Sequence, residues 1–132
     1  MSVEPTPGVV TKRSPRSVAD TVARLEELVA ARGMKLFAVV DHSGEAEVNG
    51  LELRDTKVVL FGSPQQGTPV MQSVPLAALD LPLKVLIWAA EDGTRVSYTA
   101  PAELARRYGL SDVLSARLAG IDALTDALVE KS

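Results

Sequence analysis

The clearest pattern along the chain is a stripe of apolar residues spaced by three and four. It consists of Val18, Val22, Leu25 and Val29. This spacing places all four side chains on one face of an amphipathic helix. Ser14 is a suitable N-cap and Pro15 fits the first helical position, where a missing N–H costs nothing. The pattern predicts a helix from Ser14 to about Arg32, ended by Gly33.

Five short segments are rich in apolar or β-branched residues and have the length of strands. They cover residues 9–12, 36–40, 57–61, 83–88 and 94–98. The segment 36–40 is a continuous apolar run, which predicts a strand buried on both faces. The last segment alternates apolar and polar residues, as a half-exposed strand does. Asp92-Gly93 between the final two segments indicates a hairpin.

The remaining polar and proline-containing segments predict turns and shorter helices. Residues 43–48 fit a short helix, and residues 63–67 fit a turn. Thr68-Pro69 repeats the Ser14-Pro15 pattern and predicts a second short helix starting there. Thr99 is expected to cap a helix that ends before Gly109, and one final helix is expected over residues 111–129.

The order of these elements predicts a single α+β domain. Strands and helices first alternate and then give way to a hairpin followed by helices, which favours a mixed β-sheet with helices packed on it. We expect residues 1–6 to form a disordered tail and residues 7–132 to form the domain.

Composition narrows the classes of function. The 132 residues are 46% hydrophobic but only 4% aromatic, so the core must be mainly aliphatic. The formal net charge is −3 and there is no basic stripe, which argues against nucleic acid as a partner. The absence of cysteine excludes disulfides and thiol catalysis, and no apolar run reaches the length of a membrane span. We expect a cytoplasmic protein that does not bind membranes.

Two distinctive sequence segments in the middle of the chain resemble those of a known family. The segment Phe61-Gly62-Ser63-Pro64-Gln65-Gln66-Gly67-Thr68-Pro69-Val70-Met71-Gln72 is followed by Ala77-Ala78-Leu79-Asp80-Leu81-Pro82-Leu83-Lys84-Val85. These resemble the FGNPKAGTPLMQ-like and ALDLPLKVLV segments of the DUF302 (TT1751-like) family. Val40-Asp41-His42 resembles the family's FDH element. This chain departs from the common pattern at Val40, where Phe is frequent, and at Ser63, where Asn is frequent.

The resemblance implies a fold and an assembly state but no activity. It implies a small two-layer domain and a homodimer, and it supplies no catalytic residue that could be transferred to this chain. Function must therefore be argued from the residues themselves.

The segment from Gly62 to Thr68 is the first candidate site. A strand leads there into a helix, and free N–H groups at a helix start favour an anionic ligand. The expected ligand-binding residues are Gly62, Ser63, Gly67 and Thr68 of this segment, together with His42. The alternative is a turn that recurs only for its backbone geometry, since no P-loop lysine follows.

His42 and Asp80 are the catalytic candidates. His42 is the one histidine, and its imidazole could act as acid or base near neutral pH. Asp80 lies between apolar residues and could support it, although caps and local hydrogen bonds are commoner uses of such a carboxylate. Neither a metal site nor a particular cofactor is predicted.

Three hypotheses therefore remain open at this stage. The first is a homodimeric domain that binds a small molecule, with an anion as one option, near Gly62–Thr68 with His42 close by. The second is a small enzyme that uses His42 as acid or base, with Asp80 in support. The third is a purely structural interaction protein.

Overall fold

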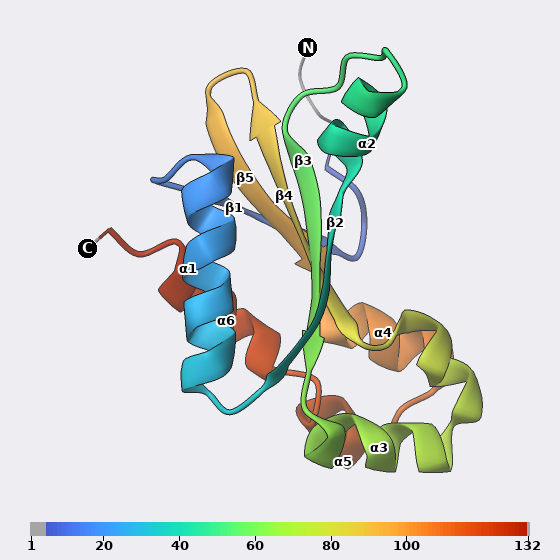
Figure 1. Ribbon diagram of the computed structural model, residues 1–132. Helices are drawn as coiled ribbons and strands as arrows, with labels where there is room; N and C mark the ends of the chain where they lie inside the picture. The colour runs from blue at the N-terminus through green and yellow to red at the C-terminus, as the bar shows by residue number, and fades with distance from the viewer. Residues whose placement is uncertain (1–4, 132) are drawn as a thin grey trace.

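The computed structural model describes residues 5–131 and shows helices packed on a five-stranded antiparallel sheet (Figure 1). The order of the strands across the sheet is β1-β5-β4-β3-β2. Their bounds are β1 Val9–Ser14, β2 Lys35–Asp41, β3 Thr56–Gly62, β4 Leu83–Ala90 and β5 Gly93–Thr99. Most of the tail expected over residues 1–6 lies outside the described residues.

The α+β class is confirmed, but the expectation of mixed strand pairing is wrong. All four neighbouring pairs are antiparallel. A helical crossover produces a parallel pair only if the strands it joins lie side by side. Here the first helix joins β1 and β2, which point the same way but lie at opposite edges of the sheet.

The helices divide between one face of the sheet and its two ends (Figure 1). Their bounds are α1 Val18–Ala31, α2 His42–Val48, α3 Pro64–Ser73, the 3₁₀ helix η1 Pro75–Asp80, α4 Pro101–Tyr108, α5 Asp112–Ala116 and α6 Gly120–Leu128. The face is covered by α1 and α6, whereas α2 lies at one end of the sheet and α3, α4 and α5 lie at the other. Helices α1 and α6 contact each other and share their buried residues with the sheet. No helix within residues 5–131 is long and apolar enough to cross a membrane.

Two apolar clusters hold these layers together. The larger one joins the inner faces of α1 and α6 to β3, β4 and β5, with Leu25, Phe61 and Leu124 fully buried. The smaller one packs α3, η1 and α4 against the segment after α5, through Val70, Ala77, Leu104 and Leu118. The Leu81–Pro82 peptide bond between η1 and β4 is cis.

Strand β2 is exposed along its length, so the prediction of a strand buried on both faces is wrong. Its apolar residues Leu36, Phe37, Val39 and Val40 are between 37% and 48% exposed. The strand lies at the edge of the sheet and has one strand neighbour, β3. A continuous apolar run therefore marks here an unprotected edge rather than a central strand.

Two helix starts differ from the sequence prediction. Ser14 ends β1, and Ser17 caps α1 instead by accepting a hydrogen bond from the N–H of Asp20 at 3.1 Å. Residues 63–67 are the first turn of α3 rather than a separate turn, because the N–H groups of Gln66 and Gly67 both donate to Ser63 O. Pro69 consequently lies inside α3.

The C-terminal helices also differ in detail. Ala100, not Thr99, is the N-cap residue of α4, which ends at Gly109 with a left-handed φ of 61° as expected. The single helix expected over residues 111–129 is divided into α5 and α6. Leu118 lies in this break and is buried in the smaller cluster.

Candidate functional site

A cavity of about 430 Å³ opens where β3 runs into α3. It is walled by the start of α3, the segment between η1 and β4, the start of α6 and the segment after α1. Phe37 reaches it from β2, next to the irregularity in the β2–β3 register between Leu36 and Ala38. The size is within the range of natural small-molecule pockets.

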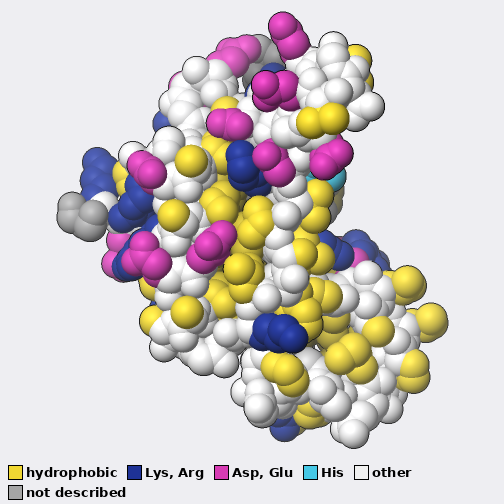
Figure 2. Space-filling model, viewed as in Figure 1, with side chains coloured by type: hydrophobic (Ala, Val, Ile, Leu, Met, Phe, Trp, Pro, Cys, Tyr) yellow, Lys and Arg dark blue, Asp and Glu magenta, His cyan; other side chains and the backbone are white. Residues whose placement is uncertain are grey.

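The lining of this cavity is mostly apolar. Phe61, Leu118, Ile121 and Leu124 are buried side chains of the two cores that also line the cavity. Met34 and Met71 add flexible thioethers that can adapt to a ligand's shape. Hydrophobic side chains gather in the hollow between the α1 side and the α3 end of the molecule (Figure 2). Such a surface favours an apolar ligand.

Two arginines, Arg32 and Arg117, are the charged residues that line the cavity. Arg32 follows α1 as its C-cap, where the helix dipole favours a cation. Arg117 lies in the break between α5 and α6, and its Nη1 donates to Gln66 Oε1 at 3.4 Å. Ser63 and Gln66 supply further polar groups. The cavity therefore combines an apolar interior with positive charge and hydrogen-bonding groups.

Three of the five predicted ligand-binding residues, Gly62, Ser63 and Gly67, line this cavity, and Thr68 and His42 do not. The expectation that free backbone N–H groups of this segment bind an anion is nevertheless wrong. The N–H of Gly67 donates to Ser63 O at 2.8 Å, and Thr68 lies within α3, where N–H groups serve the helix ladder. The segment thus contributes cavity walls instead of free N–H groups for an anion.

His42 lies far from this cavity. It is the exposed first residue of α2, directly after Asp41, which is paired with Lys57 near the start of β3. Gly62 lies at the opposite end of the same strand. Gly62 is five residue steps from Lys57, a span of about 16 Å at ~3.3 Å per residue. The structure therefore does not bring His42 together with the Gly62–Thr68 segment.

Asp80 is engaged in contacts between η1 and α4. It accepts hydrogen bonds from the Tyr108 hydroxyl and from Arg107 Nη1, the latter at 2.9 Å. The Tyr108 hydrogen bond, followed by that of Arg107, holds the pKa of Asp80 below its usual range. This carboxylate fastens η1 to α4 through side chains distant in sequence, rather than forming the cap or local hydrogen bond that the sequence favoured as its structural use.

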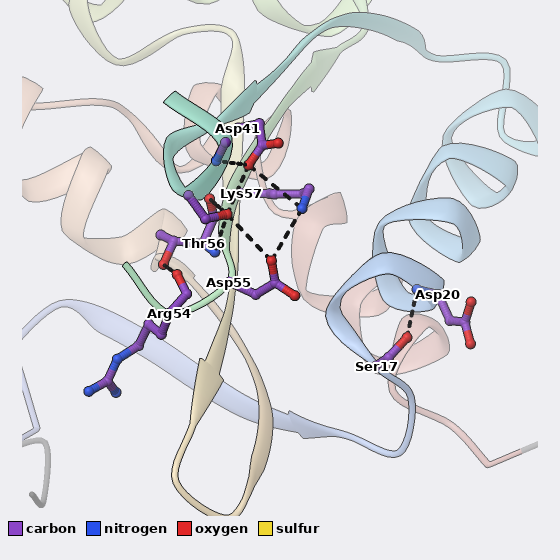
Figure 3. Close-up of polar contacts among 9 residues, drawn as sticks. Ser17, Asp20, Asp41, Arg54, Asp55, Thr56 and Lys57 are labelled. Atoms are coloured by element: carbon purple, nitrogen blue, oxygen red, sulfur yellow. Dashed lines mark hydrogen bonds and ion pairs between the residues drawn. The ribbon is translucent and has the colours of Figure 1, made fainter. Parts of the chain in front are cut away.

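A second, polar hollow lies beside α2 and the start of β3. Figure 3 shows the polar contacts of Asp41, Asp55 and Lys57 at this place. Asp41 caps α2 by accepting from the N–H of Gly44 and the hydroxyl of Ser43, both at 2.9 Å. These hydrogen bonds lower the pKa of Asp41. Lys57 Nζ lies 3.7 Å from Asp41 and 3.6 Å from Asp55. Every charge in this network has a partner, and no group of residues within 5–131 has the composition of a metal site.

Sequence reasoning missed most of the cavity because its residues are distant along the chain. Arg32, Phe37 and Arg117 come from three separate segments, and two of them lie where an element ends or breaks. The one available signal was a pair of arginines outside the apolar stripes. That signal has no meaning until the break between α5 and α6 is known.

The fold and site together define a class of protein: a small α+β domain with helices on an antiparallel sheet and an apolar cavity at one sheet end. Residues 10–128 match the family model described as "Domain of unknown function DUF302". The chain belongs to the DUF302 family. The resemblance and the fold expected from it are thereby confirmed.

A solved structure has the same fold. It is the crystal structure of an uncharacterized conserved DUF302 protein from Bacillus stearothermophilus, with a TM-score of 0.79 and 18% sequence identity. The match covers 94% of this chain and 97% of that one.

Curated relatives with higher identity are longer proteins. This chain is 39% identical over 125 residues to proteins named fluoride-specific ion channel FluC 1 in Brucella suis and FluC 2 in Brucella melitensis. The alignment covers 89% of this chain but only 48% and 46% of those proteins. The chain therefore spans about half the length of the curated relatives it matches.

Proposed function

We propose that this chain is a cytoplasmic small-molecule-binding domain that works as a homodimer and holds its ligand in the cavity between β3, α3 and α6. The observation that carries the proposal is the cavity itself, a preformed apolar space of about 430 Å³ with a few polar groups at hand. The lack of cysteine is consistent with a reducing compartment.

Filling the cavity tests the binding proposal. A Cβ at Gly67 would lie 3.9 Å from Met71 Cε and 4.0 Å from Leu81 Cδ1, so Gly67→Leu directs its side chain toward these lining residues. A neutral apolar probe, 1-octanol, should shift the amide NMR signals of Gly62 and Gly120 in the wild type and in Gly67→Ala. It should shift them much less in Gly67→Leu. Equal shifts in all three proteins, or no shift in the wild type, would overturn the proposal.

The two edges of the sheet support the homodimer. Strand β1 carries Lys12 and Arg13, and charges on an edge strand discourage pairing with another chain. The middle of β2, residues 36–40, has no charge and exposes four large apolar side chains. An uncovered edge of this kind favours contact with another chain. We infer that the occupant is a second copy, whose β2 lies along this one.

A charge placed in β2 tests this interface. Val40→Lys should convert a dimer to a monomer in light scattering at about micromolar protein concentration, because a lysine ammonium strongly resists burial. Val113→Lys, the same change on α5 at a side chain that is 71% exposed, should leave the dimer intact. A monomeric wild type under these conditions would contradict the proposal.

The geometry gives little support to the enzyme hypothesis. An acid–base pair must lie within hydrogen-bond reach of one reacting molecule. His42 lies at the far end of β3 from the cavity, and Asp80 is held by Tyr108 and Arg107. We therefore favour binding over catalysis by these residues.

The names of the curated relatives support a second candidate, a role in the cell's response to fluoride. The supporting observation is the 39% identity to about half of proteins named fluoride-specific ion channels. Cells without this chain should then grow less well in fluoride, and the plasmid-borne chain should restore growth. Unchanged growth over a fluoride series would exclude this role.

A further inference from the structure

We propose that the natural ligand of the cavity is an anionic amphiphile: an apolar chain that fills the cavity and ends in one oxyanion held by Arg32 and Arg117. This inference rests on the proposed binding function and names the chemical class of the ligand. Two observations support this inference. Two arginines line the cavity, and no acidic residue within 5–131 lines it.

Arg32 and Arg117 differ from several other cationic side chains of this protein because neither forms an ion pair described for residues 5–131. Salt bridges to carboxylates within residues 5–131 engage Lys12, Arg13, Arg24, Lys57, Arg95, Arg106 and Arg107. Arg32 and Arg117 are in none of these described ion pairs. Arg117 instead makes a long hydrogen bond of 3.4 Å to the neutral amide of Gln66. Both guanidinium groups are therefore available to an external anion.

No acidic residue within 5–131 lines the cavity. This is notable because the chain has more Asp and Glu than Lys and Arg, 17 against 14. A positive cavity in a chain of net negative charge attracts anions and repels cations. A guanidinium can donate two parallel hydrogen bonds to a carboxylate or phosphate group, which is the geometry that an oxyanion head requires.

The interior selects for the rest of the ligand. Leu118, Ile121 and Leu124 present aliphatic side chains and Phe61 an aromatic ring. A free phosphate or a short polar acid would leave this surface in contact with water. An alkyl chain covers it, and each buried methylene should tighten binding about fourfold until the cavity is full.

The experiment is a calorimetric titration with hexanoate, octanoate and decanoate below their micelle concentrations. Affinity should rise about fourfold for each methylene, and decanoate should bind more tightly than 1-decanol. Arg32→Gln and Arg117→Gln should each weaken decanoate about three- to tenfold while leaving 1-decanol unchanged. Decyl phosphate in the same series distinguishes a phosphate head from a carboxylate head.

Arg24→Gln is the matched control, because Arg24 lies on α1, is paired with Glu27 and does not line the cavity. It should bind decanoate like the wild type. If decanoate and decanol bind equally and neither arginine variant matters, the oxyanion inference fails while the binding function stands. If neither decanoate nor decanol shifts the amide signals of Gly62 and Gly120, the binding function itself fails.

Discussion

Glycines 33 and 67 show how the same residue type serves two different purposes in this fold. Gly33 follows α1 with a φ of 69°, a left-handed conformation that side chains with a Cβ disfavour. Gly67 lies inside α3 at an ordinary φ, and an added Cβ would meet only van der Waals contacts near 4 Å. The first glycine is required by the backbone, whereas the second is not.

Alanine at these two positions should therefore have opposite effects on stability. Gly67→Ala should stabilise the domain by about 0.5–1 kcal/mol, because alanine loses less backbone entropy in a helix. Gly33→Ala should destabilise it by about 1 kcal/mol because of the positive φ. Urea unfolding measures both, and a stabilising Gly33→Ala would contradict the backbone assignment.

Asp80 links stability to pH. Its folded pKa is depressed, first by the hydrogen bond from Tyr108 and then by Arg107, so its contribution is present above the unfolded pKa of about 3.9. That contribution is lost as pH falls through the folded value. Asp80→Asn should lower the urea midpoint at pH 7, and the difference from the wild type should shrink below about pH 4. A difference between the two proteins that stays the same at pH 7 and pH 3 would contradict this role for Asp80.

At the scale of elements, the sequence predicted helices and strands well where a single pattern decides them. The stripe Val18–Val29 identified α1, and Asp92-Gly93 identified the β4–β5 hairpin. Errors arose where two patterns compete. Ser14 and Ser17 both resemble N-caps, and the choice depends on β1 continuing to Ser14 in its pairing with β5.

Helix α6 belongs both to the core and to the cavity, which makes it a test of the site. Leu124 is fully buried and also lines the cavity, whereas Leu25 of α1 is equally buried but does not. Alanine at either position should cost about 2–5 kcal/mol. Leu124→Ala should also enlarge the cavity, so binding should favour alkanoates longer than the wild type prefers.

Leu25→Ala is the matched control for this change. It should reduce stability in urea without changing the preferred chain length in titrations at a temperature where both variants are folded. If both variants changed the preferred alkanoate chain length equally, that preference would depend on the whole core and not on the cavity wall.

At the scale of the whole molecule, the sequence predicted the family and fold class but only part of the candidate site. Gly62, Ser63 and Gly67 were found because they are adjacent in an unusual motif. Arg32 and Arg117 were not, because their presence in one cavity depends on how α1 and α6 pack on the sheet. The exposure of β2 likewise depends on strand order, which a local apolar run does not encode.

Ligand binding should stabilise the whole domain. A ligand that binds only the folded state contributes about 2.7 kcal/mol when its concentration is 100 times Kd. For a domain of this size the melting temperature should rise by about 10 °C. Calorimetric melting with decanoate checks this, and Arg117→Gln at the same decanoate concentration should show a smaller rise. An unchanged melting temperature at saturating ligand would contradict binding to the folded state.

The strand order also has a consequence for how the chain is made. Val9 is paired with Thr99, and β5 is the only strand beside β1 in the described sheet. On the ribosome, β1 must therefore wait for about 85 further residues, roughly 4 to 17 seconds at ~5–20 residues per second. During that interval the apolar face of α1 has no complete sheet to pack against. Chaperones that recognise apolar segments would meet this nascent chain at its N-terminal half, and a ribosomal pause after β5 would be an effective point for folding to begin.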